Sequence, residues 1–149
     1  EHYRAAEADA QHGMTASDAH TAQLCQSLCV KSRVSHGAAL IALEQHNAAA
    51  EHFEQTVPLA AAVDDTLTAF DCLRLASFCC ERAGDPARAW AAALRALELA
   101  REIAPEQRGA STLPYLGDAL ERIAKLSPNP KPSIETLRSE LAALLEQAK

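Results

Sequence analysis

The sequence predicts an all-α protein, and three observations lead to this fold class. The 149 residues include 33 alanines and 19 leucines but only eight valines and isoleucines together, which favours helices over strands. Apolar residues recur at intervals of three and four, as on one face of a helix. Short turn signals separate these stretches. A chain of this length can bury a sufficient core without disulfides, so we expect one domain over residues 1–149.

The helix boundaries follow from residues with strong positional preferences. In Gly84-Asp85-Pro86, the glycine suits a helix stop, the aspartate an N-cap and the proline a first helical position. Other capping signals are Thr15 with Asp18, Asp64-Asp65 and Ser133. The proline-rich stretch 127–132 cannot be helical. We therefore predict about seven helices, paired as antiparallel hairpins, near residues 2–12, 17–45, 47–62, 66–83, 86–103, 112–126 and 133–148.

The chain also repeats itself with a period of 40 residues. This shift aligns three small residues, Gly37, Ser77 and Gly117, and places Leu40, Cys80 and Leu120 three residues after them. Alanines follow twelve residues after the first two small positions, at Ala49 and Ala89. A fixed period of this length is typical of repeat architectures, in which neighbouring units stack.

This pattern resembles the tetratricopeptide repeat (TPR), in a long variant of about 40 residues. The middle unit matches best, through Leu73, Ala76, Ser77 and Cys80, the Gly84-Asp85 turn, and Ala89, Ala93 and Ala96. The resemblance implies a right-handed superhelix of stacked hairpins, with units at about 30–62, 70–103 and 110–148 and residues 1–29 as a helical cap. Thr56 and Asn129-Pro130 depart from the family's second-helix alanines. An unrelated helical bundle is the alternative.

Charge and motif content exclude several functions. A formal charge of −6 disfavours nucleic-acid binding, and no apolar run approaches the roughly 20 residues that span a bilayer. We find no catalytic motif and expect no enzyme, catalytic residue, cofactor or metal. Cys25 with Cys29, and Cys72 with Cys79, share helix faces with leucines and are expected in the core; a metal at the first pair would lack further ligands. Five reduced cysteines indicate a cytoplasmic protein.

The TPR resemblance implies a concave groove lined by the first helix of each hairpin. Among the residues at the family's groove positions are five apolar side chains and three arginines, which we take as the candidate site: Val34, Ile41, Leu75, Phe78, Tyr115, Arg74, Arg82 and Arg122. The family's carboxylate clamp is not inherited, because Val34, Ala38 and Leu75 occupy positions where it requires Lys or Asn.

These positions predict a non-catalytic module that binds a protein segment, either a peptide or a helix, in the groove. Two other interpretations stay open. A terminal helix of the same chain fills the groove, or the chain is a self-associating regulatory segment of a larger bacterial protein and forms homo-oligomers.

Overall fold

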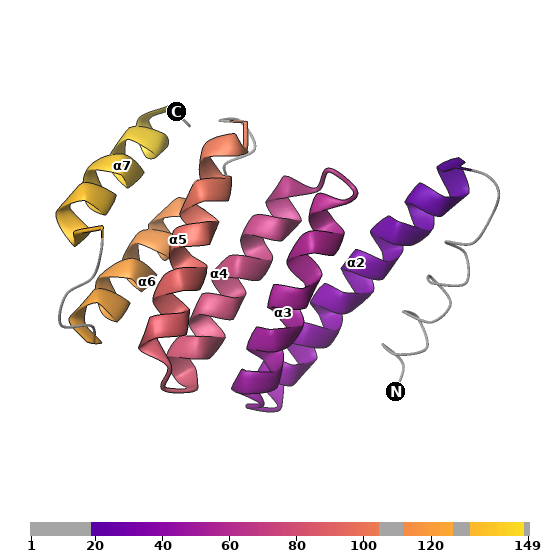
Figure 1. Cartoon of the computed structure of the whole chain (residues 1–149), viewed down its shortest axis with the longest axis horizontal. Helices are drawn as coiled ribbons and strands as arrows, with labels where there is room; N and C mark the ends of the chain where they lie inside the picture. Colours follow the sequence, from indigo (N-terminus) through magenta and orange to yellow (C-terminus); the bar gives the residue numbers. More distant parts are fainter. Residues whose placement is uncertain (1–18, 105–111, 127–131, 148–149) are drawn as a thin grey trace.

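A computed structural model describes residues 19–104, 112–126 and 132–147. These residues form six helices and no strand: α2 (Ala19–Ala42), α3 (His46–Ala61), α4 (Thr66–Arg82), α5 (Pro86–Glu102), α6 (Thr112–Leu126) and α7 (Ile134–Gln147) (Figure 1). The all-α prediction is confirmed. Six helices are described where the sequence predicted seven, because the expected helix near 2–12 lies outside the described residues. The Thr15–Asp18 capping signal of the helix predicted at 17–45 also lies outside them.

The turns between α2 and α5 repeat one backbone geometry every 20 residues. Glu44, Asp64 and Gly84 each follow a helix end with φ of 58°, 57° and 80°. The amide of the next residue then donates to the carbonyl five residues back, from Gln45 to Leu40, Asp65 to Ala60 and Asp85 to Cys80, at 2.9–3.0 Å. This is the hydrogen-bonding pattern of a helix that stops at a left-handed residue. Each helix therefore reverses direction through an identical short turn.

Capping residues fix where the following helices begin. The Asp65 and Asp85 carboxylates accept hydrogen bonds from the backbone amides of Thr68 and Arg88, respectively, each at 3.0 Å. Pro86 occupies the first turn of α5. Ser133 Oγ accepts a hydrogen bond from the Thr136 amide at 3.3 Å and so caps the start of α7. These predicted boundaries are confirmed. The predicted end of α2 at residue 45 is three residues too late, because the chain turns at Glu44, a residue type that gives no stop signal.

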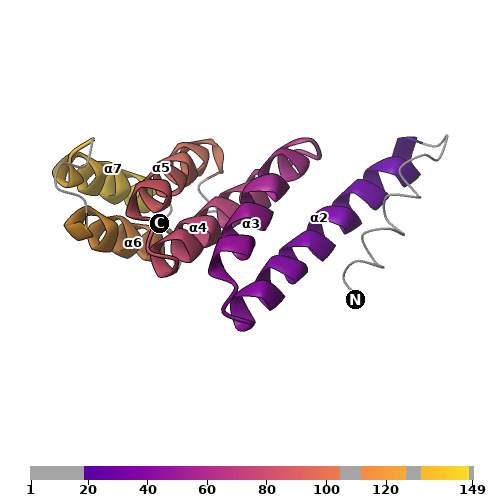
Figure 2. The same ribbon diagram turned by 60° about the horizontal axis from the view of Figure 1, so that its bottom comes forward.

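Consecutive helices pack against each other from α2 to α7, and α4 also contacts α6. Figure 2 shows α5 and α7 in one layer and α4 and α6 in the other. We call α2, α4 and α6 the first helices, because each begins a hairpin with the helix that follows. In both ribbon views α2 diverges from α3 toward its own N-terminus.

The core is built largely from small side chains, which let helices approach closely. Buried alanines line α3 and α5, and the larger Phe53, Phe70, Leu97 and Trp90 fill the spaces between them. Two of the three small repeat residues lie at tight crossings. A Cβ added to Gly37 would lie 2.6 Å from the ring of buried Phe53, and buried Ser77 donates through Oγ to the Ala89 carbonyl at 2.9 Å. Gly117 is looser, since an added Cβ would meet only Leu141, at 3.4 Å.

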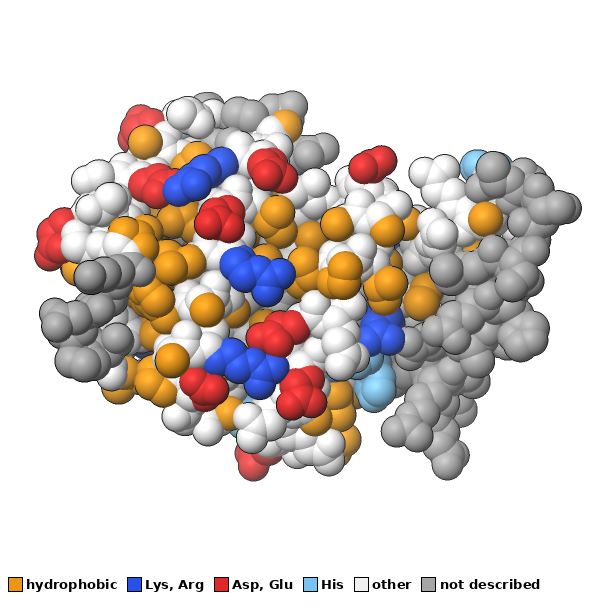
Figure 3. Space-filling model, viewed as in Figure 1, with side chains coloured by type: hydrophobic (Ala, Val, Ile, Leu, Met, Phe, Trp, Pro, Cys, Tyr) orange, Lys and Arg blue, Asp and Glu red, His pale blue; other side chains and the backbone are white. Residues whose placement is uncertain are grey.

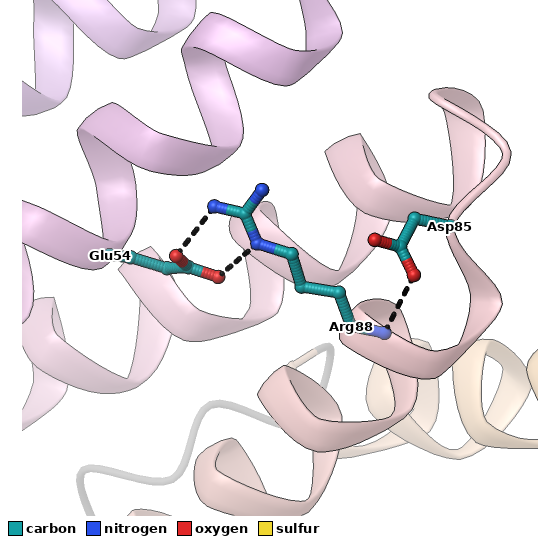
Figure 4. Close-up of polar contacts among 3 residues, drawn as sticks. All are labelled: Glu54, Asp85 and Arg88. Atoms are coloured by element: carbon teal, nitrogen blue, oxygen red, sulfur yellow. Dashed lines mark hydrogen bonds and ion pairs between the residues drawn. The ribbon is translucent and has the colours of Figure 1, made fainter.

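Ion pairs join equivalent helices of successive hairpins. Arg88 of α5 donates to both carboxylate oxygens of Glu54 on α3, at 3.1 and 2.7 Å, while its own amide is bound by Asp85 (Figure 4). Hydrogen bonding to Glu54 raises the pKa of Arg88. Arg122 of α6 pairs with Glu81 of α4, and Arg101 of α5 with Glu140 of α7. On the face seen in Figure 3, positive side chains accordingly lie mostly beside negative ones.

Candidate interaction surface

Exposed large apolar side chains are concentrated on the first helices. Among the described residues, those on α2, α4 and α6 are Leu24, Leu28, Leu67, Phe78, Tyr115 and Leu126. Leu43 follows α2, Leu59 lies on α3, and α5 and α7 carry none. We use the term first-helix face for the surface formed by Leu24, Leu28, Leu67, Phe78 and Tyr115. Six of the eight exposed large apolar side chains of the described residues thus lie on the first helices.

An ion pair links the α4 and α6 parts of this face. Leu67 and Phe78 lie 11 residues apart, about three helical turns, and so share one side of α4. Glu81, one turn beyond Phe78, accepts from Arg122 of α6 at 3.1 and 3.3 Å. Arg122 lies two turns after Tyr115, whose side chain is 63% exposed. The face therefore passes from α4 to α6 across an ion pair.

The eight residues predicted from the TPR resemblance fall into three groups. Val34, Ile41 and Leu75 are half-buried and pack against the core. Phe78 and Tyr115 are exposed. Of the arginines, Arg74 pairs with Asp71 on its own helix at 3.3 Å, Arg122 pairs with Glu81, and Arg82 is exposed. Two apolar side chains and one arginine of the predicted set are thus most accessible, while two arginines already contact carboxylates of this chain.

Phe78 is held at the face by a histidine. His46 begins α3, and its ring lies edge-on to the Phe78 ring, with 6.4 Å between the centroids and planes at 90°. His46 Nδ1 is buried without a hydrogen-bond partner. The aromatic contact fixes the orientation of Phe78, which still leaves 38% of its surface exposed. Phe78 therefore both supports the helix crossing and contributes to the surface.

A cleft of about 530 Å³ lies at the α2 end of the first-helix face. Ser27 and Lys31 of α2 form one wall. The other walls come from the turn before α4 and from the end of α5: Val63, Asp64, Asp65, Thr66, Leu67, Glu102 and Ile103. The cleft combines apolar side chains with three carboxylates and one ammonium group. Its volume lies within the range of small binding sites.

Four of the five cysteines lie in the core of the described residues, and Cys25, which was also expected there, is only partly covered. Cys29, Cys72, Cys79 and Cys80 are buried, and Cys25 is half-buried. Burial raises the pKa of Cys72 to about 12 and that of Cys79 to about 11, so both thiols stay protonated near neutral pH. Within the described ranges, no group of three or more His, Cys, Asp or Glu side chains is placed to hold a metal ion.

Comparisons with known proteins found no relative of this chain. No family model, no curated protein and no solved structure matches the chain. In the part of the chain that the structure describes, no helix is long and apolar enough to cross a membrane.

Leu24, Leu28, Leu67 and the adjoining cleft were not predicted from the sequence. Leu67 could have been found, because it lies three turns before Phe78 on the same side of its helix. For Leu24 and Leu28 the available signal was the absence of any charged residue from Ala19 to Val30. Their exposure depends on how far α3 reaches along α2, which the apolar pattern does not specify.

Proposed function

We propose that this protein is a non-catalytic interaction module that binds a peptide or helical segment of another protein on the first-helix face. In this proposal the hairpins form a TPR-like stack, and the face corresponds to the family's concave surface. The observation that carries the proposal is the concentration of exposed large apolar side chains on α2, α4 and α6. Apolar side chains that meet a partner gain free energy from burial, and aromatic residues are common anchors.

Tyr115 and Phe78 are the proposed anchors at the α4–α6 end. Tyr115 has most of its side chain in solvent, so its replacement by alanine removes contact area without disturbing the core. Loss of an aromatic anchor costs about 1–3 kcal/mol of binding free energy, or roughly a tenfold to hundredfold increase in Kd.

The experiment is selection of binding peptides from a displayed random library on the immobilised chain. We expect selected peptides to lose at least about tenfold in affinity for Tyr115→Ala and Phe78→Ala. Leu59→Ala is the matched control, because Leu59 has the same 38% exposure as Phe78 but lies on α3. Circular dichroism checks that each variant keeps its helices. Failure to select any peptide, or equal losses for all three variants, would contradict the proposal.

A further inference from the structure

We propose that the cleft and the adjoining leucines of α2 bind a basic amphipathic segment of a partner protein, with an apolar stripe flanked by Lys or Arg. This inference rests on the proposed function, because it specifies which partner chemistry fits one end of the first-helix face. The class of partner follows from the shape, apolar content and charge of the cleft.

The α2 wall extends beyond the helix that supports it. Helix α2 has 24 residues and α3 has 16, and at a rise of about 1.5 Å per residue α2 is longer by about 12 Å. The two helices are joined by the turn at Glu44, so this excess lies at the N-terminal end of α2. Leu24 and Leu28 lie on this end with 52% and 58% of their surface exposed.

This end of α2 has the composition of an interface. No Asp, Glu, Lys or Arg occurs from Ala19 to Val30, although 23% of the whole chain is charged. Depletion of charged residues is the compositional signature of interface cores. Across the cleft, Leu67 adds a third leucine, with 40% of its surface exposed. An apolar helix stripe can therefore contact leucines from both walls.

The rim of the cleft is acidic. Asp64 and Glu102 are exposed, and neither takes part in any of the ion pairs found among the described residues. The Asp65 carboxylate is bound to the Thr68 amide and hydroxyl at 3.0 and 2.7 Å. Lys31 is the one cation among the residues that line the cleft. Two carboxylates are thus available to cations of a partner, and opposite charge there favours binding.

Charge also distinguishes the possible occupants. Residues 1–18 contain four carboxylates, Glu1, Glu7, Asp9 and Asp18, against one arginine, Arg4. A second copy of the chain carries a formal charge of −6. Both would bring like charge to Asp64 and Glu102, whereas a basic segment brings the opposite charge. Net charge therefore favours a basic partner over residues 1–18 or a second copy of the chain.

The test uses the full chain and two fluorescent probes in anisotropy titrations. One probe is a short amphipathic helical peptide of Leu, Ala and Lys, and the other has Glu in place of every Lys. We expect the Lys probe to bind at least about tenfold more tightly, and its affinity to fall with added salt. The double variant Asp64→Asn with Glu102→Gln should weaken the Lys probe by about fivefold, because it removes both exposed rim charges and each exposed charge contributes only modestly to binding. Asparagine tolerates the left-handed backbone at residue 64.

The matched control is Glu98→Gln with Glu135→Gln, which removes the same charge from exposed positions on α5 and α7 outside the cleft lining. This control should keep the Kd within about twofold. A second variant, Leu24→Ser with Leu28→Ser, should weaken the Lys probe while circular dichroism stays unchanged.

Several outcomes would overturn the inference. They are equal binding of the Glu probe, no effect of the Asp64/Glu102 variant, or no binding of the Lys probe. Two other outcomes would identify a different occupant. Probe binding that appears only after deletion of residues 1–18 assigns the cleft to that segment, and a dimer lost in the Leu24/Leu28 variant assigns it to a second copy. In each case, library peptides that still depend on Tyr115 leave the proposed function standing.

Discussion

The helix crossing at Gly37 and the one at Gly117 share one sequence signal but differ in tightness. Both glycines occupy the same position of the 40-residue period. At Gly37 an added Cβ would lie 2.6 Å from the Phe53 ring, whereas at Gly117 it would lie 3.4 Å from Leu141 Cδ1. The partner residue, a buried phenylalanine in one hairpin and a leucine in the other, sets this difference. A small residue in register thus predicts where helices cross, and the residue opposite determines how closely.

The two regions also differ in their connections. From α2 to α5 every helix reverses through the same left-handed turn. After α5 this pattern ends, because the C-cap residue Ile103 has an extended backbone with φ −70° and ψ 132°. The α2–α5 region therefore combines close crossings with uniform turns, whereas the crossing at Gly117 between α6 and α7 is looser. Substitutions in both regions test this contrast.

Gly37→Ala should destabilise the protein most. Phe53 is fully buried, so its ring cannot move away from the new Cβ, and overpacking of this kind costs about 1–3 kcal/mol. We expect a loss of about 2 kcal/mol in the free energy of unfolding, measured by urea denaturation. Phe53→Leu in the same chain should recover part of this loss, since it makes room for the methyl group. An unchanged midpoint in Gly37→Ala would show that α2 and α3 are farther apart.

Arg88→Met should cost about 1 kcal/mol of stability, because it breaks a two-point ion pair that is about two-thirds buried. Arg101→Met is the control, since the Arg101 side chain is 53% exposed and water already screens its pair with Glu140. Thermal unfolding of both variants should show the larger decrease for Arg88→Met. Equal decreases would mean that the α3–α5 pair contributes no more than the α5–α7 pair.

Glu44→Gly should stabilise the protein by about 0.5 kcal/mol. A side chain at φ 58° is strained, and glycine relieves that strain at a partial cost in unfolded-state entropy. Gly84→Ala introduces the same strain at φ 80° and should destabilise by about 1 kcal/mol. If urea denaturation shows changes of opposite sign in the free energy of unfolding for the two variants, the turns at residues 44 and 84 are equivalent. Changes of the same sign would contradict this equivalence.

Gly117→Ala should have the smallest effect, less than about 0.5 kcal/mol in either direction. Alanine favours the helix by up to about 1 kcal/mol, and its Cβ, 3.4 Å from Leu141 Cδ1, lies at the short limit of van der Waals contact, so a small shift of Leu141 offsets part of that gain. The measurement is the same urea titration as for Gly37→Ala, which makes the two variants a matched pair. A loss as large as that of Gly37→Ala would remove the difference between the two crossings.

The helices could be predicted from the sequence because their signals are local. Gly84-Asp85-Pro86 combines three residues with strong positional preferences, and the turn lies at the predicted place. The end of α2 was placed too late, because Glu44 takes up a conformation that its residue type does not favour. Packing against the following helix imposes this turn, and no local signal describes it.

The surface was predicted less completely for a similar reason. The TPR resemblance predicted Val34, Ile41 and Leu75 as surface residues together with Phe78, but neighbouring helices cover them to different extents. Likewise, nothing within α4 shows that Glu81 meets Arg122, which lies 41 residues away. A one-dimensional pattern gives the direction of a side chain, and the distance to the next helix decides whether it stays exposed.

The equal spacing of Glu44, Asp64 and Gly84 has a consequence for how such a chain can grow. A tandem duplication of residues 45–84 would again join a left-handed residue to a helix-starting one, since Gly84 would precede Gln45. The inserted pair of helices would keep both of the turns that connect it to its neighbours. Length is therefore a variable that this architecture can change by whole modules, through gene duplication or by design.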